Sequence, residues 1–180
     1  FSHFDAEPVA SASIAQVHKA VTKEGKTVAV KILRPGIEQA FARDLDLFFW
    51  IAELIERYVP ARAKRLKPRP IVQTLKESVF FELDLRFEAA AACELAANMK
   101  KHEPGFRVPA VDWARTSKRV LTAEWMDGIP LSDVTAIKQS GLNVDAILAK
   151  AARSLFAQVF IDGFFHADLH PGNLFVDKNG

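Results

Sequence analysis

Two residues near the end of the chain, Asp168 and Asn173, have the spacing of a phosphoryl-transfer site. They lie in His-Ala-Asp-Leu-His-Pro-Gly-Asn (166–173), which follows an apolar stretch. Enzymes that move a phosphoryl group use one carboxylate to orient or deprotonate the attacking hydroxyl. They use an amide oxygen five residues later to hold magnesium on the nucleotide phosphates. We therefore predict that Asp168 is catalytic and that Asn173 is a magnesium ligand.

Lys31 ends the otherwise apolar run Val-Ala-Val-Lys (28–31) and needs an anionic partner, because a lysine is almost never buried unpaired. Glu-Leu-Asp-Leu-Arg-Phe-Glu (82–88) offers the carboxylates. On an unbroken helix Asp84 and Glu88 share one face, whereas Glu82 lies about 240° around from Glu88. Apolar neighbours favour an inward Glu88, so we predict a Lys31–Glu88 pair. The alternative is a solvated Lys31, with Glu88 paired locally to Arg86.

A stretch rich in alanine and serine, residues 8–18, precedes the Lys31 strand where ordinary kinases have a glycine-rich phosphate loop. Small side chains let a backbone approach a phosphate, although alanine reaches positive φ less easily than glycine. By itself this stretch is a weak signal. The candidate nucleotide-binding residues in it are Ala10, Ser11, Ala12, Ser13, Ile14, Ala15, Gln16 and Val17.

Other chemistry has less support in the sequence. His166, Asp168 and His170 alternate in a way that also suits zinc, but no second histidine cluster completes such a site. Cys93 is the only cysteine, which excludes a disulfide framework, and its alanine-rich surroundings predict a small buried side chain. A net charge of +2 gives no reason to expect nucleic acid as a partner. The basic residues between 62 and 69 are interpreted as a solvated loop or, alternatively, as a contact with an anionic membrane surface.

Apolar periodicity and turn residues predict the order of the elements. A hairpin of strands 16–21 and 27–33 is followed by a helix at 37–59, a loop at 61–70 and a long helix at 71–101. Strands at 106–113 and 118–125 come next, then a hinge at 126–130, a helix at 144–160 and a strand at 174–176. Residues 177–180 are interpreted as a hairpin turn whose second strand is missing. No apolar stretch approaches the roughly 20 residues of a membrane span.

This order predicts an α+β, protein-kinase-like fold with two lobes. Residues 1–126 are predicted to form an N-lobe, in which an antiparallel sheet packs with helices and an extra helix precedes the long one. Residues 127–180 are predicted to be the truncated start of a helical C-lobe that carries the catalytic loop.

Taken together, four motifs in this order resemble the UbiB (ADCK) family of atypical protein-kinase-like proteins, which support ubiquinone biosynthesis. They are Ala-Ser-Ala-Ser-Ile-Ala-Gln-Val-His (10–18), Val-Ala-Val-Lys (28–31), Glu-Leu-Asp (82–84) with Glu88, and His-Ala-Asp-Leu-His-Pro-Gly-Asn (166–173). The resemblance spans essentially the whole chain.

The resemblance implies a set of roles. Residues 10–18 match the family's alanine-rich loop, Lys31 its ATP-binding lysine and Glu88 the partner of that lysine. Glu82 and Asp84 match a Glu-x-Asp motif near the nucleotide. The implied hinge beside adenine is formed by Glu124, Trp125 and Met126. Two motifs of the family, a Lys-x-Gly-Gln helix and Asp-Phe-Gly, are not in this sequence, and a fragment without them is expected to bind nucleotide poorly or to be inactive.

The implied function is an ATP- and Mg²⁺-dependent atypical kinase or ATPase that supports ubiquinone biosynthesis at the cytoplasmic face of the bacterial inner membrane. Its expected partners are an isoprenoid lipid or quinone precursor and other ubiquinone-biosynthesis proteins. Membrane association is expected through a C-terminal region outside this chain. Two alternatives stay open: a small-molecule phosphotransferase of the aminoglycoside or choline kinase type, and a non-catalytic, nucleotide-gated lipid-binding scaffold.

Overall fold

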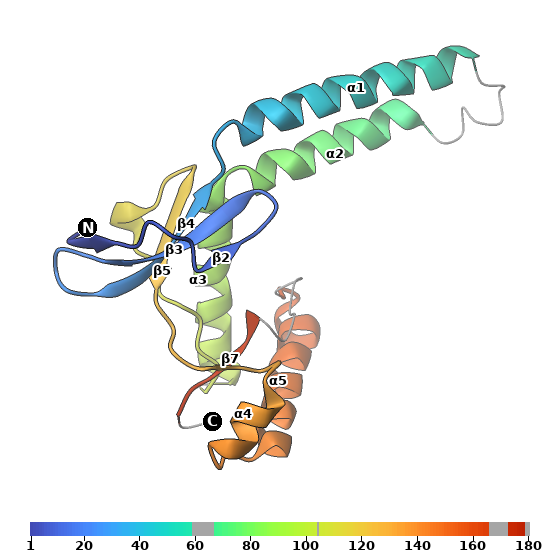
Figure 1. Ribbon diagram of the computed structural model, residues 1–180. Helices are drawn as coiled ribbons and strands as arrows, with labels where there is room; N and C mark the ends of the chain where they lie inside the picture. The colour runs from blue at the N-terminus through green and yellow to red at the C-terminus, as the bar shows by residue number, and fades with distance from the viewer. Residues whose placement is uncertain (59–66, 104, 166–172, 179–180) are drawn as a thin grey trace. The chain divides into compact units, whose positions relative to one another are not determined.

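The computed structural model describes residues 1–58, 67–103, 105–165 and 173–178. Its elements, shown in Figure 1, fall into two compact units. Unit 1 comprises Phe1–Ala89 and Asp112–Thr122, and unit 2 comprises Ala90–Val111 and Ala123–Gly180. The predicted lobe boundary after Met126 stays a prediction.

Unit 1 is built on a five-stranded sheet in the order β1-β3-β4-β5, with β2 also paired to β3. The strands are β1 (His3–Phe4), β2 (Ala10–Ser11), β3 (Ala15–Val21), β4 (Thr27–Leu33) and β5 (Val120–Glu124). The predicted hairpin is confirmed, because β3 and β4 run antiparallel with Val17 opposite Lys31. Gly25 has a φ of 81°, the left-handed conformation that glycine adopts without steric cost, and it lies in the turn between the two strands.

One face of this sheet supplies the core of unit 1. Side chains alternate between the two faces of a strand, so Val28 and Val30 of β4 point to the same side. They pack with Ala20 of β3, and Ile32 and Val120 cover the cluster. This packing explains why the apolar run of β4 forms a strand. Because side chains alternate, Lys31 lies on the opposite face of the sheet from Val28 and Val30.

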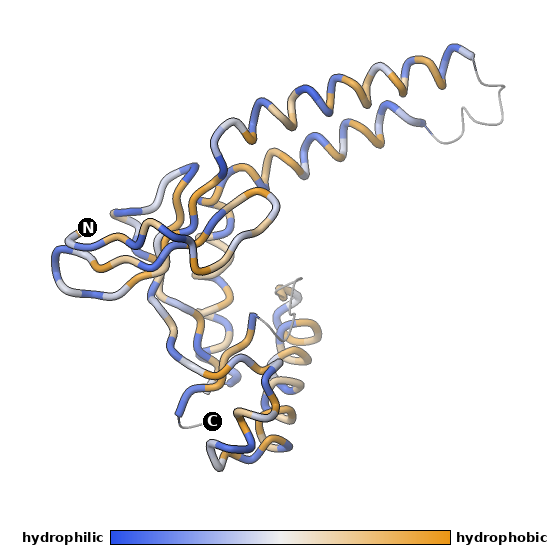
Figure 2. Tube along the Cα trace, in the orientation of Figure 1, coloured by the Kyte–Doolittle hydropathy of each residue, from blue (hydrophilic) through white to orange (hydrophobic). Residues whose placement is uncertain are grey.

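Two helices of unit 1, α1 (Ile37–Tyr58) and α2 (Pro68–Glu82), lie side by side as an antiparallel hairpin (Figure 1). The predicted helix 37–59 is therefore confirmed. Figure 2 shows apolar and polar residues interspersed along both helices. Only Leu45 and Ala52 of α1 are buried, and Trp50 and Tyr58 are more than half exposed. Contacts between the two helices therefore cover only part of the apolar surface of α1.

The prediction of one long helix over 71–101 is wrong, because the helix is interrupted at Leu83–Asp84. A new helix, α3 (Leu85–His102), begins there. The Asp84 carboxylate accepts a hydrogen bond from the Arg86 backbone N–H (3.1 Å), as an N-capping side chain does. The Leu85 N–H donates to the carbonyl oxygen of Lys118 beside the sheet (2.9 Å). These two bonds start the second helix on a new axis.

Unit 2 contains the second half of α3, α4 (Val134–Gln139), α5 (Val144–Ala157) and a π-helical turn (Gln158–Asp162). A short antiparallel pair, β6 (Ile129–Pro130) and β7 (Phe175–Val176), completes it. One core cluster joins Leu95 and Met99 of α3 to Ala157 of α5. A second joins Ile137, Ile147 and Val176. The predicted helix 144–160 and strand 174–176 are confirmed with shorter bounds.

Three further predictions are wrong. Residues 106–113 form no strand, because only Val111 makes a bridge, to Ala123. Asp112 instead starts a turn, in which its carbonyl accepts from the Arg115 backbone N–H (3.1 Å). The predicted loop 61–70 ends too late, because two prolines at the start of α2 begin that helix at Pro68. Cys93 is exposed rather than buried, since it lies on the outer face of α3. Helix α4 and strands β1, β2 and β6 were not expected, and each is too short to leave a periodic signal.

Candidate functional site

The predicted contact between Lys31 and Glu88 is present in unit 1. The Lys31 ammonium donates to both carboxylate oxygens of Glu88, at 2.8 and 2.7 Å. Lys31 comes from the end of β4 and Glu88 from the first turn of α3. Their side chains are 29% and 48% exposed, so the pair is accessible to a ligand rather than sealed in the core. A lysine held in this way presents its charge at a fixed place, as a phosphate contact requires.

Asp84 has a structural task in this arrangement. It is 4% exposed, and besides capping α3 it accepts from the Arg86 guanidinium at 2.9 and 2.6 Å. The Arg86 hydrogen bonds lower the pKa of Asp84 against the opposing effect of burial. Because Glu88 lies one helical turn beyond the cap, Asp84 fixes the start of the helix that carries it. Glu82 is exposed at the end of α2.

The alanine-rich stretch forms a tight hairpin on the edge of the sheet. Ala10 pairs with Val17 and Ser11 with Gln16, and the Ala12 N–H donates to the Ala15 carbonyl (2.9 Å). Within the described residues, Lys67 is the one non-glycine residue with positive φ, so this turn is made without left-handed backbone. Alanine and serine therefore suffice to form this turn, and its contact with a nucleotide stays a prediction.

Arg34, for which the sequence predicted no role, holds this hairpin in place. Its Nε and Nη2 atoms both donate to the Ala12 carbonyl at 3.2 Å. Its backbone N–H donates to the Ile14 carbonyl at 2.8 Å. The turn of the alanine-rich hairpin is thus attached to the end of β4, three residues after Lys31. A basic residue directly after a strand was the only signal in the sequence.

The predicted hinge residues lie at the end of β5 and just beyond it. Glu124 accepts from the Arg107 guanidinium (2.8 Å), and its backbone N–H donates to the Ala110 carbonyl (2.8 Å). Trp125 donates its indole N–H to Asp127 (2.8 Å). Their contact with adenine, like that of Met126, stays a prediction.

Asp168 lies outside the described residues, and the structure describes the chain on either side of residues 166–172. Before them, Phe164 packs against the cluster that contains Met99. After them, Asn173 is exposed, the Leu131 N–H donates to the Leu174 carbonyl (2.8 Å), and Val176 is buried beside Ile137. The roles of Asp168 and Asn173, and their convergence with Lys31 on one nucleotide, stay predictions.

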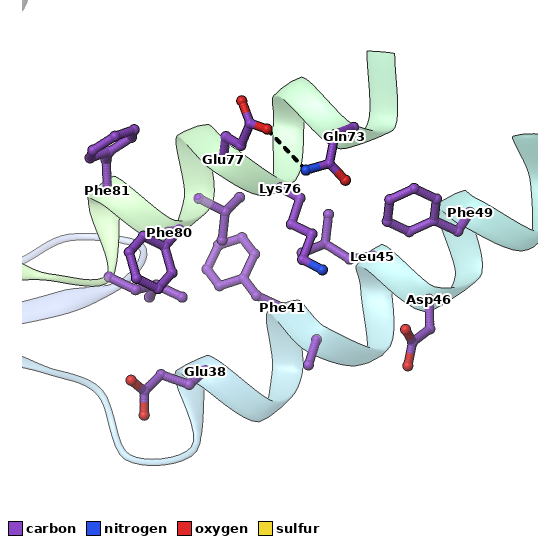
Figure 3. Close-up of a pocket in the computed structure, with 13 residues that line it drawn as sticks. Glu38, Phe41, Leu45, Asp46, Phe49, Gln73, Lys76, Glu77, Phe80 and Phe81 are labelled. Carbon is purple, nitrogen blue, oxygen red and sulfur yellow. Dashed lines mark hydrogen bonds between the residues drawn. The ribbon is translucent and has the colours of Figure 1, made fainter. Parts of the chain in front are cut away.

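A groove of about 400 Å³ lies between α1 and α2. Figure 3 shows Phe41 and Leu45 of α1 facing Phe80 of α2 across it, with Lys76 reaching over the apolar floor. None of the predicted site residues lines the groove. It is a product of the incomplete packing of the helical hairpin, and it adds nothing to the predicted nucleotide site.

In the part of the chain that the structure describes, no group of three or more histidine, cysteine or acidic side chains is placed to hold a metal ion. His18, one of the scattered histidines, is buried and bonds the Asp5 carbonyl (2.9 Å), which is a structural role. None of the described helices has the length and apolar character needed to cross a membrane.

The chain is similar to known proteins over almost its whole length. Residues 1–180 match the family described as ABC1 atypical kinase-like domain. "Probable protein kinase UbiB" of Marinobacter nauticus is 45% identical over 177 residues, covering 98% of this chain and 32% of that protein. The protein of the same name from Xylella fastidiosa is 42% identical over 179 residues, covering 99% and 32%. The chain thus spans about a third of the length of these relatives.

A solved structure gives the same result for the fold. The complex of Rv3197 with erythromycin from Mycobacterium tuberculosis matches with a TM-score of 0.73 and 33% identity. The match covers 98% of this chain and 43% of that one. The fold is kinase-like, as predicted. The chain therefore belongs to the ABC1 (UbiB) family of atypical kinase-like proteins.

Proposed function

We propose that the protein containing this chain is an ATP- and Mg²⁺-dependent kinase-like ATPase that supports ubiquinone biosynthesis at the cytoplasmic face of the bacterial inner membrane. The observation that carries the proposal is the ion pair between Lys31 and Glu88, at 2.7 Å, in a chain of this family. A lysine on a strand and a glutamate on the following long helix are the pair with which kinases hold nucleotide phosphates. The relatives named UbiB support the biosynthetic context.

In this proposal the charge of the triphosphate is offset by Lys31, whose position Glu88 fixes. Asp168 orients the attacking oxygen and accepts its proton, while the bond from the γ-phosphorus to the bridging oxygen breaks and ADP leaves. With water as the nucleophile the products are ADP and inorganic phosphate. The alanine-rich hairpin held by Arg34 covers the phosphates with backbone.

Magnesium is compatible with the residues present, because it is usually held by one or two protein oxygens together with substrate phosphates. An exposed amide such as that of Asn173 suits this role better than a closed cage of carboxylates would. Asn173 would hold the ion, and the ion would supply positive charge to the phosphate oxygens. An isoprenoid lipid or quinone precursor, and other proteins of the same biosynthetic route, are the proposed partners.

The test is hydrolysis of Mg-ATP by the full-length protein, with and without lipid vesicles and a phenolic quinone precursor. Asp168→Asn is expected to lower turnover at least about a hundredfold while ATP still binds, because only the group that handles the proton is lost. Lys31→Ala is expected to weaken ATP binding instead. Wild-type turnover in the Asp168→Asn protein would refute the catalytic assignment, and unchanged nucleotide affinity in the Lys31→Ala protein would refute the phosphate contact.

A further inference from the structure

His102 and Asp162 form a hydrogen-bonded pair in unit 2 that the proposed chemistry does not use. His102 is the last residue of α3, and its Nε2 atom lies 2.9 Å from Oδ1 of Asp162. An ionised carboxylate can only accept, so the imidazole donates its Nε2–H. The Asp162 side chain is 9% exposed and that of His102 is 27% exposed. The carboxylate is therefore taken almost fully out of water for a single partner.

The second oxygen of Asp162 makes this pair unusual. Oδ2 is buried and has no hydrogen-bond partner among the described residues. A buried acceptor without a partner costs about 1–3 kcal/mol, and more when it is charged, so such a group calls for an explanation other than stability. Asp162 also ends the π-helical turn Gln158–Asp162. Turns of this kind are rare and are found frequently at functional sites.

Asp162 lies where the chain leaves this turn for the Asp168 motif. Gly163 follows with a φ of 62°, and the Phe164 N–H returns to the Gln158 carbonyl (3.1 Å). Phe164 then packs on the cluster of Leu95 and Met99 from α3. The path of the chain is thus fixed at Asp162 by His102 and two residues later by the core. Only three residues, 163–165, lie between Asp162 and His166.

The exit from the motif is fixed within the same unit. Ile129 pairs with Val176 and Pro130 with Phe175 in the β6–β7 ladder, and Val176 is 7% exposed. The segment that carries Asp168 and Asn173 therefore starts and ends at defined points of unit 2. The exit depends on backbone pairing and apolar burial. The entry has a backbone hydrogen bond and an apolar contact at Phe164, and in addition the side-chain hydrogen bond between His102 and Asp162.

We propose that His102 and Asp162 are positioning residues that set where the chain enters the catalytic motif, and that they act on turnover rather than on nucleotide binding. The inference rests on the proposed ATPase activity. A misplacement of about 1 Å in a catalytic group can cost about a hundredfold in rate, whereas ATP would keep its contacts with Lys31. The Asp162 carboxylate is buried although its Oδ2 atom has no hydrogen-bond partner among the described residues. This cost is retained because the carboxylate fixes the path of the chain into the motif.

The test compares three variants of the full-length protein with wild type. His102→Ala removes the donor, and His102→Gln keeps an N–H donor at a similar reach. Arg153→Ala is the matched control, because Arg153 on α5 pairs with Glu103 next to His102, at 3.4 Å, but lies before the π-helical turn. Measurements are kcat and KM for Mg-ATP, the Kd for ATP, the melting temperature, and hydrogen exchange of peptides covering 163–174. Asp168→Asn serves as the inactive reference.

We expect His102→Ala to lower kcat about ten- to a hundredfold, with KM and Kd for ATP changed less than about twofold. Exchange in 163–174 should rise in this variant alone, and His102→Gln should recover most of the turnover. Wild-type kcat in His102→Ala beside an inactive Asp168→Asn protein would overturn the inference and leave the proposed function standing. Equal losses in kcat and melting temperature in both His102 variants would overturn it as well. If wild type and Asp168→Asn hydrolyse ATP equally slowly, the proposed function fails, and unchanged exchange in His102→Ala would then refute the positioning role by itself.

Discussion

Replacing Asp84 by alanine is expected to lower the free energy of unfolding by about 1–2 kcal/mol and to loosen the helix that carries Glu88. The Asp84 carboxylate accepts three hydrogen bonds, all from Arg86: from the backbone N–H at 3.1 Å, from Nε at 2.9 Å and from Nη2 at 2.6 Å. Alanine would remove both acceptor oxygens, and with them all three hydrogen bonds, at the first turn of α3.

The magnitude follows from what each bond contributes. Loss of an N-capping acceptor costs about 1 kcal/mol, because a helical N–H is left without its partner. The Arg86 guanidinium belongs to a side chain that is 60% exposed and recovers its hydrogen bonds from water, so losing its ion pair adds at most about 1 kcal/mol. Alanine itself fits a site that is 4% exposed.

Asp84→Asn separates the cap from the charge. Asparagine caps a helix about as well as aspartate, so this variant should lose at most the contribution of the ion pair, about 1 kcal/mol, and keep the Lys31–Glu88 contact. If Asp84 instead bound nucleotide or magnesium through its charge, asparagine would be as harmful as alanine to ATP binding. Urea unfolding and ATP titration of the three proteins decide between these roles.

The pH dependence gives an independent check. Hydrogen bonds from Arg86 lower the pKa of Asp84 in the folded protein, so the folded state binds this proton less readily than the unfolded state does. The resulting stability is fully present above the unfolded pKa of about 3.9 and is lost as the pH falls through the lowered folded value. Asp84→Asn should lose this acid-side component. Unfolding curves between pH 2 and 6 that are parallel for the two proteins would contradict the reasoning.

Two further predictions concern the alanine-rich hairpin and the connector after the hinge. Arg34→Ala removes two donors from the Ala12 carbonyl. It should weaken ATP binding about three- to tenfold, with little change in melting temperature. Equal affinity of the variant and wild type in an ATP titration would argue against a role for the hairpin. Gly128→Ala would place a Cβ 2.8 Å from the Val176 carbonyl oxygen and should cost about 1–3 kcal/mol in urea unfolding. Gly105→Ala is its control, because the three nearest atoms to its Cβ belong to the end of the Lys150 side chain, which can move aside. Similar losses in both variants would refute the steric argument.

Periodicity predicted well the elements whose apolar residues repeat over several helical turns or along most of a strand. Helix α1 and the strands of the β3–β4 hairpin are of this kind. The Lys31–Glu88 contact was predicted from a different signal, the need of a lysine on an apolar strand for a carboxylate. The break between α2 and α3 could not be found in this way. The apolar positions Val79, Leu83 and Phe87 stay in phase across it, so the pattern is the same for one helix as for two.

The sequence revealed neither the contacts whose partner is a backbone atom nor the contact between His102 and Asp162. Arg34 binds the Ala12 carbonyl, and a carbonyl is present at every position, so the sequence carries no mark of it. His102 and Asp162 are 60 residues apart on elements whose helical pattern gives no information about their mutual register. The exposure of Cys93 has a similar origin, because its alanine neighbours occupy both faces of α3 and define no buried stripe.

Helix α3 emerges as the element on which both halves of the proposed chemistry depend. Its first turn carries Glu88 and is started by Asp84, whereas its last residue is His102, the partner of Asp162. In both places a polar group near the helix end is used where an apolar contact would have been enough to pack it. Apolar packing tolerates sliding along a helix, whereas a hydrogen bond to a carboxylate fixes both distance and direction. The polar contacts at the two ends of α3 are therefore best understood as devices that set the position of Glu88 and the course of the chain into the Asp168 motif.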